Sequence, residues 1–143
     1  MIARTLARKI AEYALSKKAS GVLVMDLRRL QAPADYFVVC SADSDTQVKA
    51  IADGIRDGME QAGVAVWHEE GYQSLQWVLL DYVDVVVHVF HRETRPFYNI
   101  ERLWGDAGFQ AVEDTPAGVR VRKMEHPKPK RVTKDRRAPR LAG

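Results

Sequence analysis

The chain has 143 residues, of which 46% are hydrophobic and 29% charged, a composition typical of a single soluble globular domain. No apolar run approaches the ~20 residues that a membrane-spanning helix needs. Cys40 is the single cysteine, which excludes an internal disulfide and argues against a zinc cluster, so a reducing, cytoplasmic compartment fits best.

The net charge of +3 combines an acidic body with a basic C-terminal segment. Residues 1–118 carry 12 lysines and arginines against 17 acidic residues, which gives −5. Residues 119–143 carry 10 against 2, which gives +8, and the two parts sum to +3. An acidic body does not by itself bind phosphate, whereas a basic segment can.

Hydrophobic spacing predicts a helix followed by two strands near the N-terminus. Leu6, Ile10 and Ala14 recur at the spacing of one helix face. Residues 22–27 and 36–41 are rich in β-branched and aromatic side chains, and a proline-containing turn separates them. We therefore expect these two stretches to pair as a hairpin.

A second helix is predicted to begin at Ser44. Ser44 and Gln47 form the pattern S-x-x-Q, a capping box that satisfies unpaired backbone donors at a helix start. Asp43 and Asp45 add negative charge where the helix dipole favours it, so we interpret these carboxylates as capping groups and not as metal ligands. Gly63 is a natural C-terminal stop.

Three further strands and a last helix complete the predicted elements. Pro96 lies near the start of this helix, Gly108 lies beyond its end, and Phe97 and Ile100 are expected to face inward. The three strands are expected over residues 64–71, 75–82 and 84–90.

The resulting order, α-β-β-α-β-β-β-α, predicts an α/β fold with one mixed β-sheet of about five strands and flanking helices. From Val112 onward the periodicity fades, and prolines alternate with lysines and arginines. We therefore expect residues 1–111 to form the domain and residues 112–143 to form a basic, disordered tail.

The stretch LLDYVDVVVHVF, residues 79–90, sets three polar residues into an apolar run. His88 lies in a central strand with apolar residues on both faces, and is therefore interpreted as a core residue. Asp81 and Asp84 flank a tight connection and do not converge on one Mg²⁺. The connection contains Val83, a residue that disfavours positive φ, so we expect a looser turn or local strain there.

The other polar residues do not assemble a catalytic site either. His68 adjoins Glu69 and Glu70, but consecutive strand residues point apart. No Ser–His–Asp or Cys–His arrangement and no glycine-rich phosphate loop can be placed. Binding is therefore favoured over catalysis, and no metal or cofactor is expected.

Large aromatic side chains are the candidates for a protein-binding surface, because such residues are enriched at interface hot spots. The alternative is that they fill the core between sheet and helices. Both interpretations stay open for Trp77 and Tyr82, whereas the core is favoured for Trp67 and Trp104.

Three long motifs follow one another along the chain: SADSDTQVKAIADGIRDGM (41–59), EEGYQSLQWVLLDYVDVVVHVF (69–90) and RPFYNIERLWGDA (95–107). In this order they resemble the ribosomal silencing factor family (RsfS, also called Iojap). The resemblance covers roughly residues 3–107 and excludes the tail. The chain departs from it at Val83, where the family typically has glycine.

The resemblance implies a fold similar to that of nucleotidyltransferases, without their catalysis. An active enzyme of that fold would have Gly-Ser before a helix and two acidic residues separated by one position on a strand. This chain has Ser41–Ala42 and the unsuitable pair Asp81 and Asp84.

The family resemblance also implies a function. Members bind the large ribosomal subunit through ribosomal large-subunit protein fourteen and sterically prevent the small subunit from joining, which represses translation when nutrients are short. A homodimer is expected when the protein is free. Carried over to this sequence, the protein-binding residues are Trp77, Leu79, Asp81 and Tyr82, with His88 and Tyr98 nearby.

Two alternative functions remain beside this one: a nucleotidyltransferase-like enzyme, and an RNA-binding module driven by the tail. Once the body is bound to the ribosome, the tail could add nonspecific contacts to ribosomal RNA, or it could simply be a solvated segment. The residues expected to make the RNA contacts are Arg131, Lys134, Arg136, Arg137 and Arg140.

Overall fold

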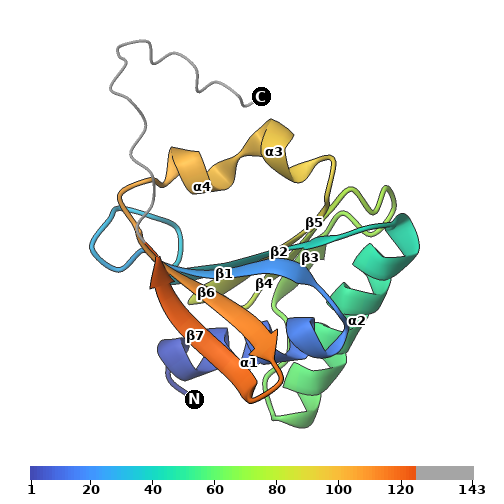
Figure 1. Ribbon diagram of the computed structural model, residues 1–143, viewed down its shortest axis with the longest axis horizontal. Helices are drawn as coiled ribbons and strands as arrows, with labels where there is room; N and C mark the ends of the chain where they lie inside the picture. Colours follow the sequence, from blue (N-terminus) through green and yellow to red (C-terminus); the bar gives the residue numbers. More distant parts are fainter. Residues whose placement is uncertain (125–143) are drawn as a thin grey trace.

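The computed structural model describes residues 1–124, and its strands form one mixed sheet (Figure 1). The strand order is β3-β4-β5-β2-β1-β6-β7; β2 and β5 are parallel, and the other neighbours are antiparallel. The strands are β1 (Ser20–Asp26), β2 (Tyr36–Ala42), β3 (His68–Glu70), β4 (Trp77–Asp81), β5 (Val85–His91), β6 (Gly108–Thr115) and β7 (Gly118–Met124).

Helices cover the two faces of this sheet unequally. The long helices α1 (Ala3–Ser16) and α2 (Asp45–Gln61) lie on one face, and the short helices α3 (Arg95–Tyr98) and α4 (Ile100–Leu103) lie on the other (Figure 1). No helix within residues 1–124 is long and apolar enough to cross a membrane.

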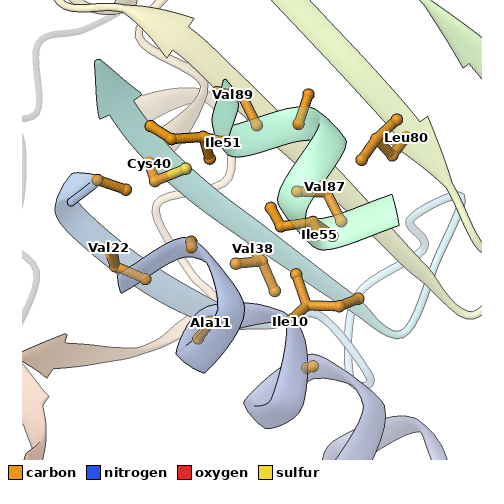
Figure 2. Close-up of a cluster of buried hydrophobic side chains, with 14 of the residues drawn as sticks. Ile10, Ala11, Val22, Val38, Cys40, Ile51, Ile55, Leu80, Val87 and Val89 are labelled. Carbon is orange, nitrogen blue, oxygen red and sulfur yellow. The ribbon is translucent and has the colours of Figure 1, made fainter. Parts of the chain in front are cut away.

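The larger core lies between the sheet and helices α1 and α2. Alternating residues of β2 and β5 point into it, together with the apolar faces of both helices. Ile10, Val38, Ile55 and Val87 are completely buried there (Figure 2). Burying one aliphatic side chain of this size contributes roughly 1.5–3 kcal/mol, so this layer supplies most of the hydrophobic stabilisation.

A smaller core lies on the opposite face, beneath α3 and α4. Phe37, Phe90 and Phe109 of the sheet are buried there with Ile100, and Trp104 packs against them half-buried. Because β5 contributes to both cores, all of its residues but the last are buried, as expected for a central strand.

The predicted start of α2 is confirmed, with one change in the capping bonds. The Gln47 N–H donates to Ser44 Oγ at 3.1 Å. The Gln47 side chain accepts from the Asp43 N–H at 2.7 Å and not from that of Ser44. The same amide also donates to the Lys18 carbonyl at 3.0 Å, which ties the helix start to the turn after α1.

The α/β fold is confirmed, but the sheet has seven strands and not about five. The expectation of a disordered tail is wrong for residues 112–124, because β6 continues to Thr115 and pairs with β7. The strand β6 also pairs with β1 and so extends the sheet. Residues 125–143 lie outside the described residues, and so do the five expected RNA contacts Arg131, Lys134, Arg136, Arg137 and Arg140.

The last helix is divided into two. Asn99 adopts a left-handed conformation with φ 45°, which asparagine tolerates better than most residues, and it separates α3 from α4. Ile100 is buried as expected, whereas Phe97 is 80% exposed and does not face inward.

Candidate protein-binding surface

Strand β4 presents the central residues of the candidate site. Its Val78 and Leu80 are completely buried in the larger core. Trp77, Leu79 and Asp81 alternate with them and point to the opposite face, where each is partly exposed. The short helices leave this part of the face incompletely covered. We call Trp77, Leu79, Phe97 and Tyr98 the aromatic surface.

Trp77 is held from several sides. Its indole N–H donates to His88 Nδ1 at 3.1 Å. Its ring stacks on Phe90 with centroids 4.9 Å apart, and it contacts Tyr98 of α3 at 4.6 Å. These contacts fix the orientation of a side chain that still exposes part of its surface.

His88 supports Trp77 from beneath. It is 4% exposed, lies opposite Leu79 in the β4–β5 register, and meets Phe37 edge to face at 4.5 Å. Burial lowers the pKa of His88 to about 3, so the ring is neutral. Because an indole N–H can only donate, Nδ1 accepts and Nε2 carries the proton. Within residues 1–124, Nε2 has no hydrogen-bond partner.

Arg95 fastens the short helices to the sheet. Its Nε donates to Glu101 Oε2 at 2.9 Å, and Nη1 donates to Ser41 Oγ at 2.8 Å and the Gly21 carbonyl at 2.9 Å. Gly21 has φ +56° at an irregularity in β1, and a Cβ there would lie 2.8 Å from Arg95 Nη1. The guanidinium thereby holds α3 in place, and with it Tyr98 beside Trp77.

The loop before β4 also fits tightly against Trp77. Gly71 has φ +93°, and a Cβ at this position would lie 1.9 Å from the Trp77 carbonyl oxygen. A larger residue could not occupy position 71 without moving the β4 main chain. The hydroxyl of the neighbouring Tyr72 donates to Asp53 Oδ1 of α2 at 3.1 Å, and this bond anchors the loop to that helix.

Asp81 belongs to a strained turn. Its Oδ1 accepts from the Val83 N–H at 2.8 Å, and the Asp84 N–H donates to the Tyr82 carbonyl at 2.9 Å. The latter bond closes a γ-turn around Val83, whose φ is 75°. The prediction of strain at Val83 is therefore confirmed. The carboxylate stabilises the turn, and across residues 1–124 no group of three or more His, Cys, Asp or Glu is placed to hold a metal ion.

The structure does not bring Tyr82 to the aromatic surface. Tyr82 is 6% exposed and packs into the larger core, on the opposite face of the sheet from Trp77. Burial raises the pKa of its hydroxyl to about 12. Strand alternation between positions 77 and 82 could have shown this separation in advance.

The two other tryptophans differ from each other. Trp104 packs against the smaller core, as expected, with its ring 6.1 Å from that of Phe37. Trp67 was expected in the core but is 71% exposed just before β3. Sequence reasoning also missed Phe97, which meets Tyr98 edge to face at 5.1 Å and extends the aromatic surface outward.

Strand β3 adds an acidic border that sequence reasoning missed. Glu70 lies opposite Leu79, and His68 lies opposite Asp81. His68 Nε2 and Glu70 Oε2 are 2.8 Å apart, whereas Glu69 between them turns to the other face and pairs with Arg56 at 2.8 Å. Two carboxylates, those of Glu70 and Asp81, therefore border Leu79.

The fold and this surface define a small mixed α/β protein whose half-exposed aromatic side chains suit binding to another macromolecule. The family model described as "Ribosomal silencing factor during starvation" matches residues 2–140. The chain therefore belongs to the ribosomal silencing factor family, and the resemblance of its three motifs is confirmed. The match extends beyond residue 107, so the expectation that the tail lies outside the family pattern is wrong.

Relatives and solved structures agree with this assignment. The ribosomal silencing factor RsfS of Bacillus subtilis is 47% identical over 100 residues, 69% of this chain and 85% of the relative. The chloroplast protein Iojap of Zea mays is 36% identical over 104 residues, 72% of this chain and 45% of the maize protein. A crystal structure of a Chromobacterium violaceum protein superposes with TM-score 0.71 at 34% identity, covering 73% of this chain and 88% of that one.

Proposed function

We propose that this chain binds the large ribosomal subunit through ribosomal large-subunit protein fourteen and sterically prevents the small subunit from joining. It would thereby repress translation under nutrient limitation, in the cytoplasm and without catalysis. Membership of the ribosomal silencing factor family supports this function. The single structural observation that carries it is the half-exposed Trp77, held ready at the centre of the aromatic surface.

The preformed position of Trp77 favours binding. Ordering a mobile side chain at an interface costs roughly 0.5–1.5 kcal/mol. His88, Phe90 and Tyr98 already fix the indole, so much of that cost has been met on folding. Large aromatic residues that enter a partner's pocket are the usual hot spots of protein interfaces.

Charge supports a basic protein partner. Glu70 and Asp81 border the aromatic surface, and residues 1–118 carry a net charge of −5. Ribosomal proteins are generally basic, and complementary charge accelerates encounter and suppresses wrong partners. The Asp81 carboxylate keeps one oxygen beyond the bond to Val83, and this oxygen would accept from a lysine or arginine of the partner.

The test follows subunit joining by light scattering, with purified subunits and increasing amounts of protein. The parent chain should prevent joining, and Trp77→Ala should weaken large-subunit binding by at least ~30-fold, about 2 kcal/mol. The matched control is Trp67→Ala, which removes the same side chain from an exposed position outside the aromatic surface. Unhindered joining at saturating parent protein would disprove the function.

Phe97→Ala provides a second test of the surface. Its ring is 80% exposed, so the substitution should leave folding intact while still weakening large-subunit binding. If folded Trp77→Ala and Phe97→Ala both bind as the parent does, the aromatic surface is not the interface.

A homodimer of the free protein would use the same aromatic surface. Sedimentation of the parent and of Phe97→Ala at equal concentration tests this, since the variant should dimerise more weakly. The enzymatic alternative has no comparable support, because Asp81 is engaged in the turn and Asp84 is separated from it by two residues. Mg²⁺-dependent nucleotide transfer that Asp81→Asn abolishes would restore that alternative.

A further inference from the structure

Strand β7 forms a basic edge at the far end of the sheet. It is the outermost strand after β6, and most of its side chains are exposed. Its sequence, GVRVRKM, contains three cations and no carboxylate. The charge of the chain changes sign here, from −5 over residues 1–118 to +8 over residues 119–143.

The two arginines of β7 share one acidic partner. Glu113 of β6 lies opposite Arg120 in the register, and its two carboxylate oxygens accept from Arg120 at 3.2 Å and Arg122 at 2.9 Å. One carboxylate cannot neutralise two guanidinium groups, and Lys123 adds a third positive charge. Both arginine side chains are about half exposed or more, at 61% and 48%. Exposed pairs of this kind are weak, so a phosphate can compete for these arginines.

We propose that β7 is an RNA-binding edge, on which Arg120, Arg122 and Lys123 contact backbone phosphates without reading sequence. Strand geometry places Arg120 and Arg122 on the same face roughly 7 Å apart and Lys123 on the opposite face. A phosphate backbone that follows this outermost strand lies within reach of long side chains from both faces. Their planar guanidinium groups suit paired hydrogen bonds to phosphate oxygens.

The basic character continues beyond the described residues. Residues 125–143 carry seven lysines and arginines against two acidic residues. Sequence alone places the previously expected contacts Arg131, Lys134, Arg136, Arg137 and Arg140 in this segment, and they would add to the same electrostatic attraction.

Two separate contacts would then act together on the ribosome. Strands β5, β2, β1 and β6 lie between β4, which carries Trp77, and β7. The aromatic surface and the basic edge can therefore be occupied at the same time. Linking a protein contact to an RNA contact raises the overall affinity beyond that of either alone. This combined action rests on the proposed function, because ribosomal RNA is the RNA that β7 would contact on the ribosome.

The test measures binding of the full chain to a labelled single-stranded RNA of mixed sequence, by fluorescence anisotropy from roughly 50 to 200 mM salt. The test variant is Arg120→Gln/Arg122→Gln/Lys123→Gln. Each phosphate contact on a single strand contributes about 0.7 to the slope of log affinity against log salt, so the slope should become shallower by about 2. The affinity at low salt should fall at least tenfold.

A matched control separates position from net charge. Arg4→Gln/Arg29→Gln/Arg92→Gln removes the same charge from three exposed positions outside β7 and should change the affinity less than threefold. Equal losses in the two variants, or parent-like binding by the β7 variant, would overturn the proposal. Because no ribosomal protein is present, this outcome is independent of whether Trp77→Ala loses the large subunit.

The competing explanation is that these cations only protect an exposed strand edge from pairing with another copy. In that case the β7 variant would self-associate in size-exclusion chromatography while its RNA binding stayed unchanged. That result would also overturn the proposal.

Discussion

The two faces of the sheet are closed to different degrees, although the same strands form both. Helices of 14 and 17 residues cover one face, and two helices of four residues each cover the other. On the first face aliphatic side chains are completely buried. On the second, aromatic rings contact one another and some remain half exposed.

Under the proposed function, this difference lets one small domain combine stability with binding. A surface that must bind a partner needs exposed apolar groups, and such groups contribute little to folding until the partner covers them. The well-covered face supplies the folding free energy, while Arg95 and His88 hold the thinly covered face in shape. Each of the following predictions tests that division.

The largest effect is expected from Ile55→Ala on the well-covered face. Ile55 is completely buried between α2 and the sheet (Figure 2), and deletion of such a side chain costs about 2–5 kcal/mol through lost burial and the cavity left behind. Phe97→Ala removes more atoms but should change stability by only about 0.5 kcal/mol, because Phe97 is 80% exposed. Urea unfolding measures the free energy of unfolding of both variants. Similar losses in the two would contradict the division between a stabilising face and a binding face.

A smaller loss is expected from Arg95→Ala. The Arg95 and Glu101 side chains are only 13% and 19% exposed, and removing one partner leaves the other mostly buried and unpaired. The cost should be about 2–3 kcal/mol, below that of a completely buried pair because some solvent reaches both groups. The matched control is Arg28→Ala, which breaks an exposed pair with Asp26 and should lower the stability far less than Arg95→Ala does.

Arg95→Ala should also loosen α3, and this can be measured separately from stability. The contact of Tyr98 with Trp77 depends on the position of α3, so tryptophan fluorescence should shift under conditions where the variant is fully folded. An unchanged spectrum would show that Arg95 stabilises the domain without positioning the aromatic surface.

Several features of the well-covered face could be predicted because they depend on local patterns. The capped start of α2 at Ser44 and the two apolar faces of β5 both follow from neighbouring residues. The strain at Val83 was predictable for the same reason, since a short connection fixed the φ that a β-branched residue had to adopt.

Features that depend on distant parts of the chain could not be predicted in this way. Strand β7 is an exception, because it pairs with the neighbouring β6 and the alternation of its valines with arginines is a local strand signal that the expectation of a tail overlooked. Trp67 lies just before β3 and Trp77 begins β4, yet Trp67 is 71% exposed whereas Trp77 contacts Tyr98 of α3. Glu70 joins the border of the aromatic surface only through the register of β3 with β4.

An intermediate effect is expected from pH, through His88. Burial lowers its pKa to about 3 in the folded state, whereas the unfolded chain binds a proton near the ordinary value of 6.5. As the pH falls below 6.5, the unfolded state therefore gains protons that the folded state does not, and stability falls. The loss should reach about 2 kcal/mol at pH 5, at about 1.4 kcal/mol per pH unit.

The comparison variant is His88→Gln, which cannot gain a charge but keeps an acceptor for the Trp77 N–H. Urea unfolding at pH 7, 6 and 5 should show the stability of the parent falling toward that of the variant as the pH decreases. Parallel curves for the two proteins would mean that the buried ring is not the group that makes the domain sensitive to acid.

The smallest effect, and the only gain, is expected from Val83→Gly. Val83 is 58% exposed with φ 75°, so glycine relieves a strained backbone while losing little packing. Relief of about 1–3 kcal/mol is partly offset by roughly 0.4–1 kcal/mol from the greater freedom of glycine in the unfolded chain, leaving a net gain of about 1 kcal/mol. The control Val119→Gly makes the same change at a 47% exposed strand position of ordinary φ and should destabilise the domain. If both variants lose stability in urea, the γ-turn does not store strain. If Val83→Gly gains stability while Val119→Gly loses it, the strained turn that holds Asp81 at the end of β4 lowers the stability of the domain. The rest of the fold then compensates for that loss.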